Sequence, residues 1–364
     1  MTFLFSRLGL YIISRVVTGV AVALVAVLAS ILLIDMVEQM RTIGEDVSML
    51  EAFRLTLLKT PMLVEQTLPF VVLAGTMMAI VGLNRSSELV AIRAAGVSAW
   101  RFLAPSAFVG AALGVFAITL LNPIGAQFYK AFESEREDAL SAFGAQAGEN
   151  GVWIRQGDRE GQVVIHADSV DASGTVLQGA TFMFFEARDN ALRFTRRMRA
   201  ETAELKPGFW QLTNLVEAAP GGRPQRHTHL AIPTSLDATE LINRFVTPAT
   251  LSFWELPGFI HEARQAGFAP TRYELKWQSL LAYPLLLAVM AGLGAAFSLQ
   301  LQRLGNLAKW GAMGVGIGLF LFFYSQLAGA FAMTQTVPAA VAAWSAPLAG
   351  MFIALAMVAF LEDG

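Results

Sequence analysis

The sequence contains no cysteine and little charge. None of its 364 residues is cysteine, which excludes disulfide bonds, thiolate metal sites and cysteine nucleophiles. Only 15% of the residues are charged, whereas a soluble domain carries about a quarter. The formal net charge is −2. Because no basic surplus exists to displace counterions from phosphates, we expect no nucleic-acid partner.

The sequence also lacks the motifs of common catalytic sites. It contains no G-x-x-x-x-G-K-[ST], no H-E-x-x-H and no G-x-S-x-G, so we expect no enzyme and no cofactor in this chain. His227 and His229 lie two positions apart, as on one face of a strand. We interpret them as solvent-exposed strand residues and not as metal ligands. Asp35, Glu38 and Glu65 fall at the ends of apolar runs, where contact with the membrane interface is the ordinary explanation. This placement disfavours an ion-coupled transporter.

Apolar residues dominate instead, at 55% of the chain, with a mean hydropathy of +0.53. Crossing about 30 Å of hydrocarbon takes roughly 20 residues. Six runs satisfy this length, at about 16–34, 66–83, 102–121, 279–299, 310–332 and 339–361. We therefore predict an α-helical integral membrane protein, with three spans in residues 1–128 and three in 277–364. The first run lacks a small-residue cleavage site, so we expect it to remain as a span.

Basic residues divide unequally between the two ends of the spans. Six spans place both termini on one side, which carries Arg7, Arg15, Arg85, Arg93, Arg101, Arg303 and Lys309. The short loops opposite carry only Arg41, Arg54 and Lys59. Positive charge marks the cytoplasmic side. The termini and the segment 83–102 are therefore expected in the cytoplasm, and the polar insert is expected outside.

The insert begins as a β-rich domain and ends as a helix. Within residues 129–248, short β-branched and aromatic segments alternate with turn signals, which predicts six to eight strands in a jelly roll or sandwich. Such a domain either binds an amphipathic ligand or another sheet edge, or serves as a plain cap. In residues 249–276, Ser252 and Glu255 have capping-box spacing and Gly267 suits a helix end. These features predict an interfacial helix before span four.

Between spans two and three, residues 86–95 are predicted to form a short charged helix. Ser86 is its expected N-cap, Glu88 and Arg93 suit the helix dipole at the two ends, and Gly96 supplies the stop. A mere connector is one interpretation. A rigid helix with apolar exposed faces also suits a groove on a partner, as in ATP-driven transporters, with the ATPase on a separate subunit. The expected contact residues are Arg85, Ser86, Glu88, Leu89, Ile92 and Arg93.

Small residues recur at helical spacing in two spans. Gly110 and Gly114 are four apart in span three, and Gly314 and Gly318 are four apart in span five. This spacing permits close approach of helix backbones. Packing inside one chain competes with packing against a second membrane subunit. We favour the second, because six helices are few for enclosing a substrate.

Several segments resemble one family. "LPFVVLAGTMMAIVGLNRSSELVAIRAAGVS" (68–98) closely resembles the corresponding region of the LptF/LptG permeases, the inner-membrane subunits of lipopolysaccharide export in Gram-negative bacteria. The resemblance extends to "LLNPIGAQ", "GVWIR" and "SFWELPGFIHEARQAG". "LLIDMVEQMR" and "GIGLFLFFYSQL" resemble the LptG branch of this family.

The resemblance implies a permease with a periplasmic jelly roll, paired with LptF and driven by a dimer of the ATPase LptB, which holds ATP and magnesium. Lipopolysaccharide would enter a cavity between the permeases and move to LptC and the periplasmic LptA bridge. The helix 86–95 would seat in an LptB groove through Glu88. Spans one and five would form gates facing LptF, with Gly19, Ala23, Gly314 and Gly318 at that interface.

One departure concerns the phosphates of lipid A. Family members often carry a lysine at the periplasmic end of span one, where this chain has Asp35. Arg41, Lys130 and Arg136 remain as cations for the cavity mouth. The substrate then has fewer phosphates, or Asp35 pairs with a cation of LptF, or it turns away.

Two other functions fit the same sequence. One is a permease for another envelope lipid. The other is a membrane-anchored scaffold or receptor, in which the β-domain binds a protein and the cytoplasmic helix is only a linker.

Overall fold

The computed structural model describes most of the chain, in two compact units. The described residues are 6–43, 48–98, 100–142, 152–157, 161–171, 176–188, 191–206, 208–220, 222–234, 247–265, 269–304 and 307–363. One unit comprises residues 1–133, 251–256 and 271–364, and the other comprises 134–250 and 257–270.

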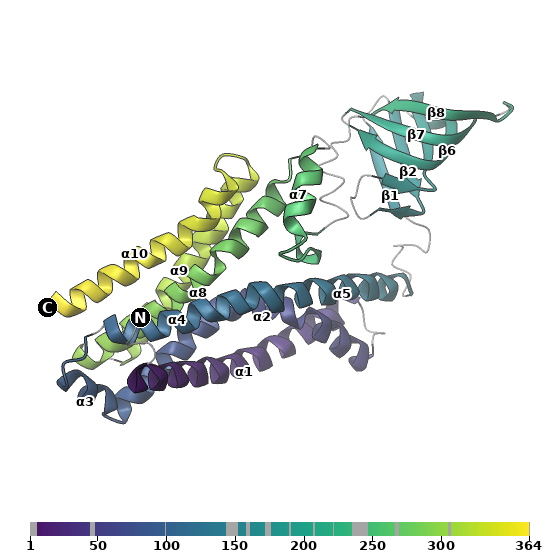
Figure 1. The fold of residues 1–364 in the computed structure, drawn as a ribbon. Helices are drawn as coiled ribbons and strands as arrows, with labels where there is room; N and C mark the ends of the chain where they lie inside the picture. Colours follow the sequence, from purple (N-terminus) through teal and green to yellow (C-terminus); the bar gives the residue numbers. More distant parts are fainter. Residues whose placement is uncertain are drawn as a thin grey trace. The chain divides into compact units, whose positions relative to one another are not determined.

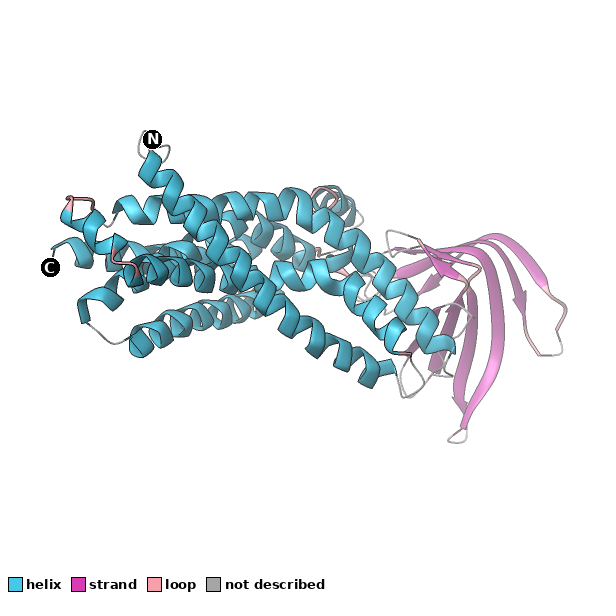
Figure 2. Ribbon diagram, turned by 90° about the horizontal axis from the view of Figure 1, so that it is seen from below, coloured by secondary structure: helices cyan, strands magenta, loops and turns pink. Residues whose placement is uncertain are grey.

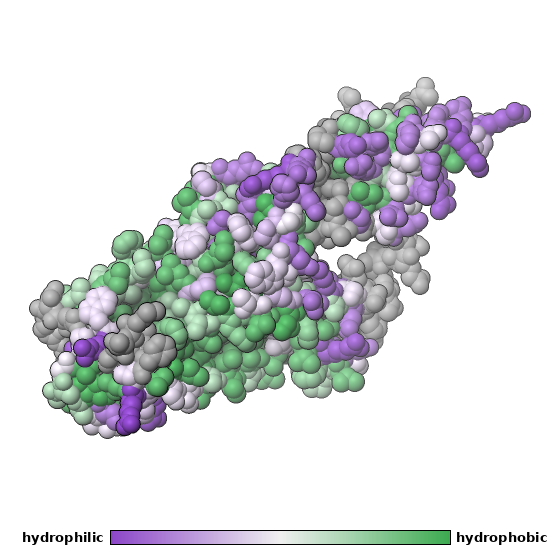
Figure 3. All heavy atoms as spheres, viewed as in Figure 1, coloured by the Kyte–Doolittle hydropathy of each residue, from purple (hydrophilic) through white to green (hydrophobic). Residues whose placement is uncertain are grey.

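The first unit is helical (Figure 1). Its helices are α1 (Arg7–Ile43), α2 (Met49–Arg85), α3 (Glu88–Ala94), α4 (Trp100–Phe116), α8 (Thr271–Leu304), α9 (Leu307–Met333) and α10 (Ala339–Asp363). Helix α4 continues through a π-helical turn, η1 (Ala117–Leu121), into α5 (Asn122–Ala142), whose residues from Ser134 onward belong to the second unit. Six helices in the described part of the chain are long and apolar enough to cross a membrane, which agrees with the six predicted spans. On the face shown in Figure 3, apolar side chains cover much of this unit.

The helices extend well beyond the apolar runs that predicted them. The second span was predicted over 66–83, whereas α2 has 37 residues. It begins with a capping box, in which the Ser48 hydroxyl accepts from the Glu51 amide and the Glu51 carboxylate accepts from the Ser48 amide. Hydropathy marks only the part of a helix that matches the bilayer, because polar flanks continue the same backbone geometry.

Two helices form the interior of this unit. In the apolar window of α2 61% of the residues are buried, and in that of α8 67% are, against 11% in α1 and 17% in α9. A helix that is apolar on all sides is buried in protein or faces lipid. Helices α2 and α8 are buried in protein, whereas α1 and α9 leave most of their apolar surface uncovered.

The second unit contains an antiparallel sheet. Its described strands are β1 (Val152–Gly157), β2 (Gly161–Ala167), β3 (Ser169–Val170), β4 (Val176–Gln178), β5 (Thr181–Arg188), β6 (Ala191–Lys206), β7 (Phe209–Ala218) and β8 (Gln225–Pro233). They form one network of eight strands, drawn as a curved sheet in Figure 2. An inserted β-domain between the third and fourth spans is thereby confirmed.

The strand connectivity is simpler than the predicted jelly roll. Strand β2 pairs with β5, and β3 pairs with β4. Both β4 and β5 also pair with β6. Because β2 leads into β3 and β4 into β5, the described strands run as one antiparallel meander, whereas a jelly roll requires two Greek keys. Strand β6, with 16 residues, is long enough to pair along both segments of its neighbour.

Alternation along the strands gives the sheet its core. Phe182 and Trp210 are fully buried, and their ring centroids lie 5.7 Å apart in an edge-to-face arrangement. Ile165 and Leu212 are buried as well, and Trp210 and Leu212 lie two positions apart on β7. Burying one face of an antiparallel sheet requires this period of two, which is the pattern that predicted the domain.

The predicted helix in residues 249–276 is shorter in the structure. After a 3-10 turn, η2 (Pro248–Thr250), helix α7 covers Leu256–Gln265. The Ser252 amide donates a hydrogen bond of 2.8 Å to Glu255 Oε2, as the capping-box spacing predicts. This hydrogen bond lowers the pKa of the Glu255 carboxyl. Gly267 lies outside the described residues.

Candidate functional site

Helix α3 follows α2 after a sharp reversal of the chain. The Ser86 hydroxyl bonds to the carbonyls of Gly82 and Leu83, at 3.3 and 3.2 Å, and so ends α2. Ser87 adopts a left-handed conformation with φ of 60°, and α3 begins at Glu88. The prediction that Ser86 is the N-cap of α3 is therefore wrong. Helix α2 continues to Arg85, and the Ser86 hydroxyl bonds to carbonyls at the end of α2 and does not cap α3.

The charged ends of α3 agree with the prediction. Glu88 lies in the first turn and Arg93 in the last. The Gly96 amide donates to the Arg93 carbonyl at 2.9 Å, and Gly96 has φ of +80°. This left-handed conformation favours glycine and stops the helix.

The faces of α3 differ in exposure. Leu89 is completely buried within this chain, so it anchors the helix. Ile92 and Arg93 are half-buried, and Arg85 is exposed. Val90 is 57% exposed and offers an apolar contact on the open side. Leu89 therefore does not lie on the exposed surface of α3, and a partner would contact the opposite face of this helix.

Glu88 is held by two side chains of α1. The Tyr11 hydroxyl donates to Glu88 Oε2 at 2.5 Å. It accepts from Arg15 Nε and Nη2, at 2.9 and 2.7 Å. Arg15 Nη2 also lies 3.7 Å from Glu88 Oε1. The three side chains, which we call the Glu88 cluster, join the helix between spans two and three to the beginning of span one.

The electrostatics of the Glu88 cluster favour the ionised acid. The hydrogen bond from Tyr11 is the main cause that lowers the pKa of Glu88, followed by one with Ser86, and Arg15 lowers it further. Hydrogen bonds to a charged group are shorter and stronger than those between neutral groups. Because Arg15 and Glu88 keep part of their surface in solvent, at 52% and 35% of the side chain, a partner can still reach the carboxylate.

The small residues of α1 and α9 pack inside the chain. A Cβ placed on Gly19 would lie 2.3 Å from the Gly75 carbonyl oxygen, and one on Gly318 would lie 2.7 Å from Leu73 Cδ2. Ala23 is 3% exposed, and Gly314 faces the Met77 side chain. The three glycines therefore serve contacts with α2, and Ala23 is buried within the chain, so these positions do not form the predicted face toward another subunit.

The glycines of α4 serve contacts with α8. A Cβ on Gly110 would lie 2.3 Å from the Leu287 carbonyl oxygen, and one on Gly114 would lie 2.4 Å from Pro284 Cα. Glycine at these positions lets the two backbones touch. Of the two interpretations of the sequence, packing inside one chain explains all of these glycines.

The uncovered surface of α1 and α9 consists instead of large apolar side chains. It includes Val22, Val25, Leu33 and Ile34 on α1, and Phe320, Phe323, Leu327 and Phe331 on α9. Surface of this kind is suited to lipid or to another membrane helix.

Asp35 pairs with a lysine of its own chain. Lys59 Nζ, on α2, lies 2.6 Å from Asp35 Oδ1, and Asp35 is only 7% exposed. Gln39 Nε2 approaches the other carboxylate oxygen at 3.4 Å. A cation of a second subunit is therefore not needed to compensate Asp35.

The cations predicted for the cavity mouth are spread out. Arg41 is exposed in the last turn of α1. Lys130 Nζ lies 3.9 Å from Glu255 Oε1, and Arg136 is half-buried on α5. No hydrogen bond or ion pair among the described residues joins these three to Asp35.

Sequence reasoning missed Tyr11, Arg15 and Lys59 as members of these sites. A tyrosine and an arginine one turn apart at the charged end of an apolar helix are a weak signal, because such residues commonly lie at the interface. The contact from Tyr11 to Glu88 joins residues 77 positions apart, and no local pattern encodes it.

The fold defines a class: a multi-pass α-helical membrane protein of six candidate spans with an inserted β-domain. A model of the family described as "Lipopolysaccharide export system permease LptF/LptG" matches residues 10–359. The chain belongs to this family, and it is thus a permease of the lipopolysaccharide export system in the inner membrane. The LptG permease protein of Haemophilus influenzae is 24% identical to it over 342 residues, covering 92% of this chain and 93% of that protein. The predicted family, with a sequence close to LptG, is confirmed.

Proposed function

We propose that this chain is the LptG-type subunit of an ATP-driven transporter that extracts lipopolysaccharide from the inner membrane. In this proposal it pairs with LptF, an LptB dimer hydrolyses ATP, and the lipid passes to LptC and the periplasmic LptA bridge. Family membership supports the proposal. The sequence has no P-loop, which agrees with hydrolysis on a separate subunit.

The observation that carries the mechanism is the Glu88 cluster. A nucleotide-binding subunit that holds α3 also holds Glu88, and Glu88 is bonded to Tyr11 of α1. Displacement of α3 is then passed to α1, the least buried span. Because α1 contacts α2 backbone to backbone at Gly19 and Gly75, the cytoplasmic parts of these helices move together. In this proposal α1 and α9 act as the gates toward LptF.

The proposal places both termini and α3 in the cytoplasm and the β-domain in the periplasm. The excess of arginine near α3 and the termini supports this orientation. Because the chain has no native cysteine, Val90→Cys and His229→Cys each introduce a single thiol at an exposed position. A membrane-impermeant thiol reagent added to intact cells with a permeable outer membrane should label position 229 and not position 90. The reverse pattern would overturn the orientation.

The Asp35–Lys59 pair bears on the substrate. The two charges lie 2.6 Å apart and compensate each other, so Lys59 is not an unpaired cation for a phosphate. Contact with lipid A is then left to Arg41, Lys130 and Arg136. A family member with an unpaired lysine at this position would bind a phosphate there. The paired lysine of this chain supports a substrate with fewer phosphates near Asp35.

Two substitutions test the coupling role. Glu88→Ala removes the carboxylate from both the partner and α1, and we expect about tenfold weaker copurification of the nucleotide-binding subunit and a loss of ATP-driven lipopolysaccharide release from vesicles. Tyr11→Phe removes only the hydroxyl, so association should persist while lipid release falls. Glu51→Ala, at the other end of α2, is the control and should preserve both. Undiminished release by the Glu88→Ala protein would contradict the coupling role.

A further inference from the structure

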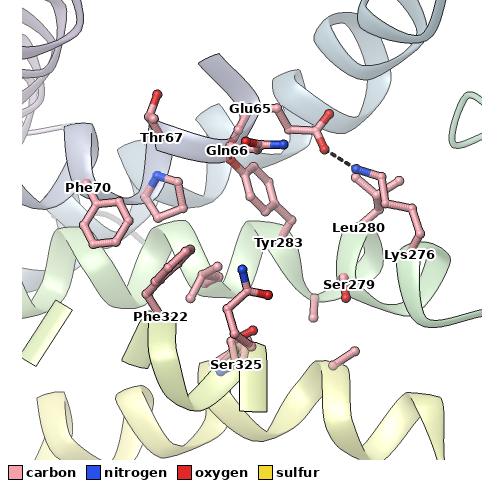
Figure 4. A pocket seen from close by; sticks show the side chains of 16 residues that line it. Glu65, Gln66, Thr67, Phe70, Lys276, Ser279, Leu280, Tyr283, Phe322 and Ser325 are labelled. Carbon is pink, nitrogen blue, oxygen red and sulfur yellow. Dashed lines mark hydrogen bonds and ion pairs between the residues drawn. The ribbon is translucent and has the colours of Figure 1, made fainter. Parts of the chain in front are cut away.

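A cavity of about 460 Å³ lies among α2, α8, α9 and α10. Figure 4 shows its lining. One part of the wall is polar and comprises Glu65, Gln66, Lys276, Ser279, Ser325 and Gln326. Another part is apolar, with Phe70, Leu286 and Phe322. This cavity involves neither the Glu88 cluster nor the Asp35–Lys59 pair.

On α2 and α8, the charged residues and the apolar residues of the wall lie at different depths. Glu65 precedes Arg85 by 20 residues of α2, or about 30 Å along the helix, which is about the thickness of the hydrocarbon. Phe70 lies deeper by more than one turn. On α8, Leu286 lies ten residues beyond Lys276, or about 15 Å. The charges are thus at the membrane interface, and the aromatic and aliphatic side chains extend from them toward the membrane centre.

The charged end contains one acid and one base held in fixed positions. Lys276 Nζ lies 2.5 Å from Glu65 Oε1, with 31% and 13% of the two side chains exposed. Asn122 Nδ2 donates to Glu65 Oε2 at 2.8 Å, and the Tyr283 hydroxyl donates to the Glu65 carbonyl. The pair carries no net charge, so it attracts neither a strongly anionic nor a cationic ligand. It presents a positive and a negative group side by side.

Further polar groups line the cavity without a partner in the protein. In the described part of the chain, the side chains of Gln66, Ser279, Ser325 and Gln326 make no hydrogen bond to protein. A polar group at membrane depth without a partner is costly. Amide and hydroxyl groups here can instead bond to the glycerol, ester and headgroup atoms of a lipid.

We propose that this cavity binds a zwitterionic glycerophospholipid with a primary amine, as in phosphatidylethanolamine. Its ammonium would lie against the Glu65 carboxylate and its phosphate against Lys276, with an acyl chain along Phe70, Leu286 and Phe322. A primary ammonium donates hydrogen bonds, as lysine does, whereas a quaternary choline cannot. An anionic headgroup would leave Glu65 facing a phosphate without the ammonium. The proposal requires only that the helices are embedded in a membrane, and not that the chain exports lipopolysaccharide.

Native mass spectrometry of the delipidated full-length protein tests this assignment. The probes are phosphatidylethanolamine, phosphatidylcholine and phosphatidylglycerol with the same acyl chains. We expect one tightly bound phosphatidylethanolamine and weaker binding of the other two. Ser325→Trp, which fills the cavity from α9, and Lys276→Gln, which removes the phosphate partner, should each weaken binding about tenfold, equivalent to about 1.4 kcal/mol.

The control is Lys59→Gln, which breaks the other ion pair and does not line the cavity. It should change phosphatidylethanolamine binding by less than about twofold, and thermal unfolding should show all variants folded. Equal binding of phosphatidylglycerol, or binding that Ser325→Trp leaves unchanged, would overturn the proposal. So would one-for-one displacement by lipopolysaccharide, because the cavity would then belong to the transported substrate. Binding is measured without the ATPase, so a failure of export leaves the result intact.

Discussion

At the scale of single residues, two acids of the spanning helices, Asp35 and Glu65, are compensated by lysines of neighbouring helices. Asp35 on α1 pairs with Lys59 on α2, and Glu65 on α2 pairs with Lys276 on α8. An ionised group near hydrocarbon is costly unless it is paired or hydrogen-bonded. These pairs therefore fix the relative positions of adjacent helices at the membrane interface. A paired charge is tolerated there, and each pair joins two particular helices.

The hydrogen bonds from Ser252 to the Glu255 carboxylate, just before α7, should make this segment sensitive to acid. The Ser252 amide, the main cause, lowers the pKa of Glu255 below its ordinary value of 4.5. A carboxyl with a lowered pKa in the folded protein stabilises it fully above the ordinary value, and the effect is lost as the pH falls through the lowered pKa. Hydrogen exchange at residues 252–256, corrected for the intrinsic rate, should be unchanged from pH 7 to pH 5 and should rise in more acidic solution.

Glu255→Gln is the control for this acid effect. Its amide still accepts a hydrogen bond but does not titrate in this range, so the rise at low pH should be absent. A rise of equal size in the Gln variant would assign the effect to another group.

At the scale of elements, glycine decides which helices touch. Helices α1 and α2 meet at Gly19 and Gly75, and α4 and α8 meet at Gly110 and Gly114. Lipid tails compete with side chains for apolar contact, so close backbone packing is a main source of helix association in membranes. The pairing of α1 with α2 also sets the distance across which Tyr11 reaches Glu88.

Substitutions at two glycines of α2 should separate this packing effect from helix propensity. A Cβ on Gly75 would lie 2.4 Å from Val20 Cα, whereas one on Gly82 meets nothing within 4 Å. Gly75→Val should destabilise the protein by about 1–3 kcal/mol through overpacking. Gly82→Ala should be neutral, or stabilising by up to about 1 kcal/mol. Thermal unfolding in detergent measures both, and equal effects of the two substitutions would contradict close α1–α2 packing.

At the scale of the whole molecule, the helical unit leaves apolar surface uncovered on two of its helices. Large apolar side chains are exposed on α1 and α9, including Val25 at 69% and Phe323 at 65%. Uncovered apolar surface contacts lipid or another membrane protein. In the proposed transporter, the same two helices form the contact with LptF.

Cross-linking in membranes tests this contact. Single cysteines at Val25 and Phe323 should form cross-links to a second permease that carries cysteines in its own spans. Val341→Cys, on α10, is an equally apolar position with 57% exposure, and it should contact lipid and give no such product. Cross-linking from position 341 as efficient as from 25 and 323 would show that exposure, and not a specific interface, determines the product.

Local sequence determined the spans, the inserted β-domain and the charged helix. The bilayer requires about 20 apolar residues per crossing, and a half-buried sheet requires alternation. Both constraints act on neighbouring residues and are visible without a fold. The placement of Glu88 and Arg93 at the ends of α3 follows from the helix dipole in the same way.

Only the tertiary structure decided which side chains meet. Gly314 and Gly318 have the spacing of an interface, but spacing does not say whether the neighbour is α2 or another subunit. The partner of Asp35 lies 24 residues away, and the partner of Glu65 lies 211 residues away. Such contacts depend on how whole helices pack, because helix rotation and pairing result from many long-range contacts together and not from any local segment.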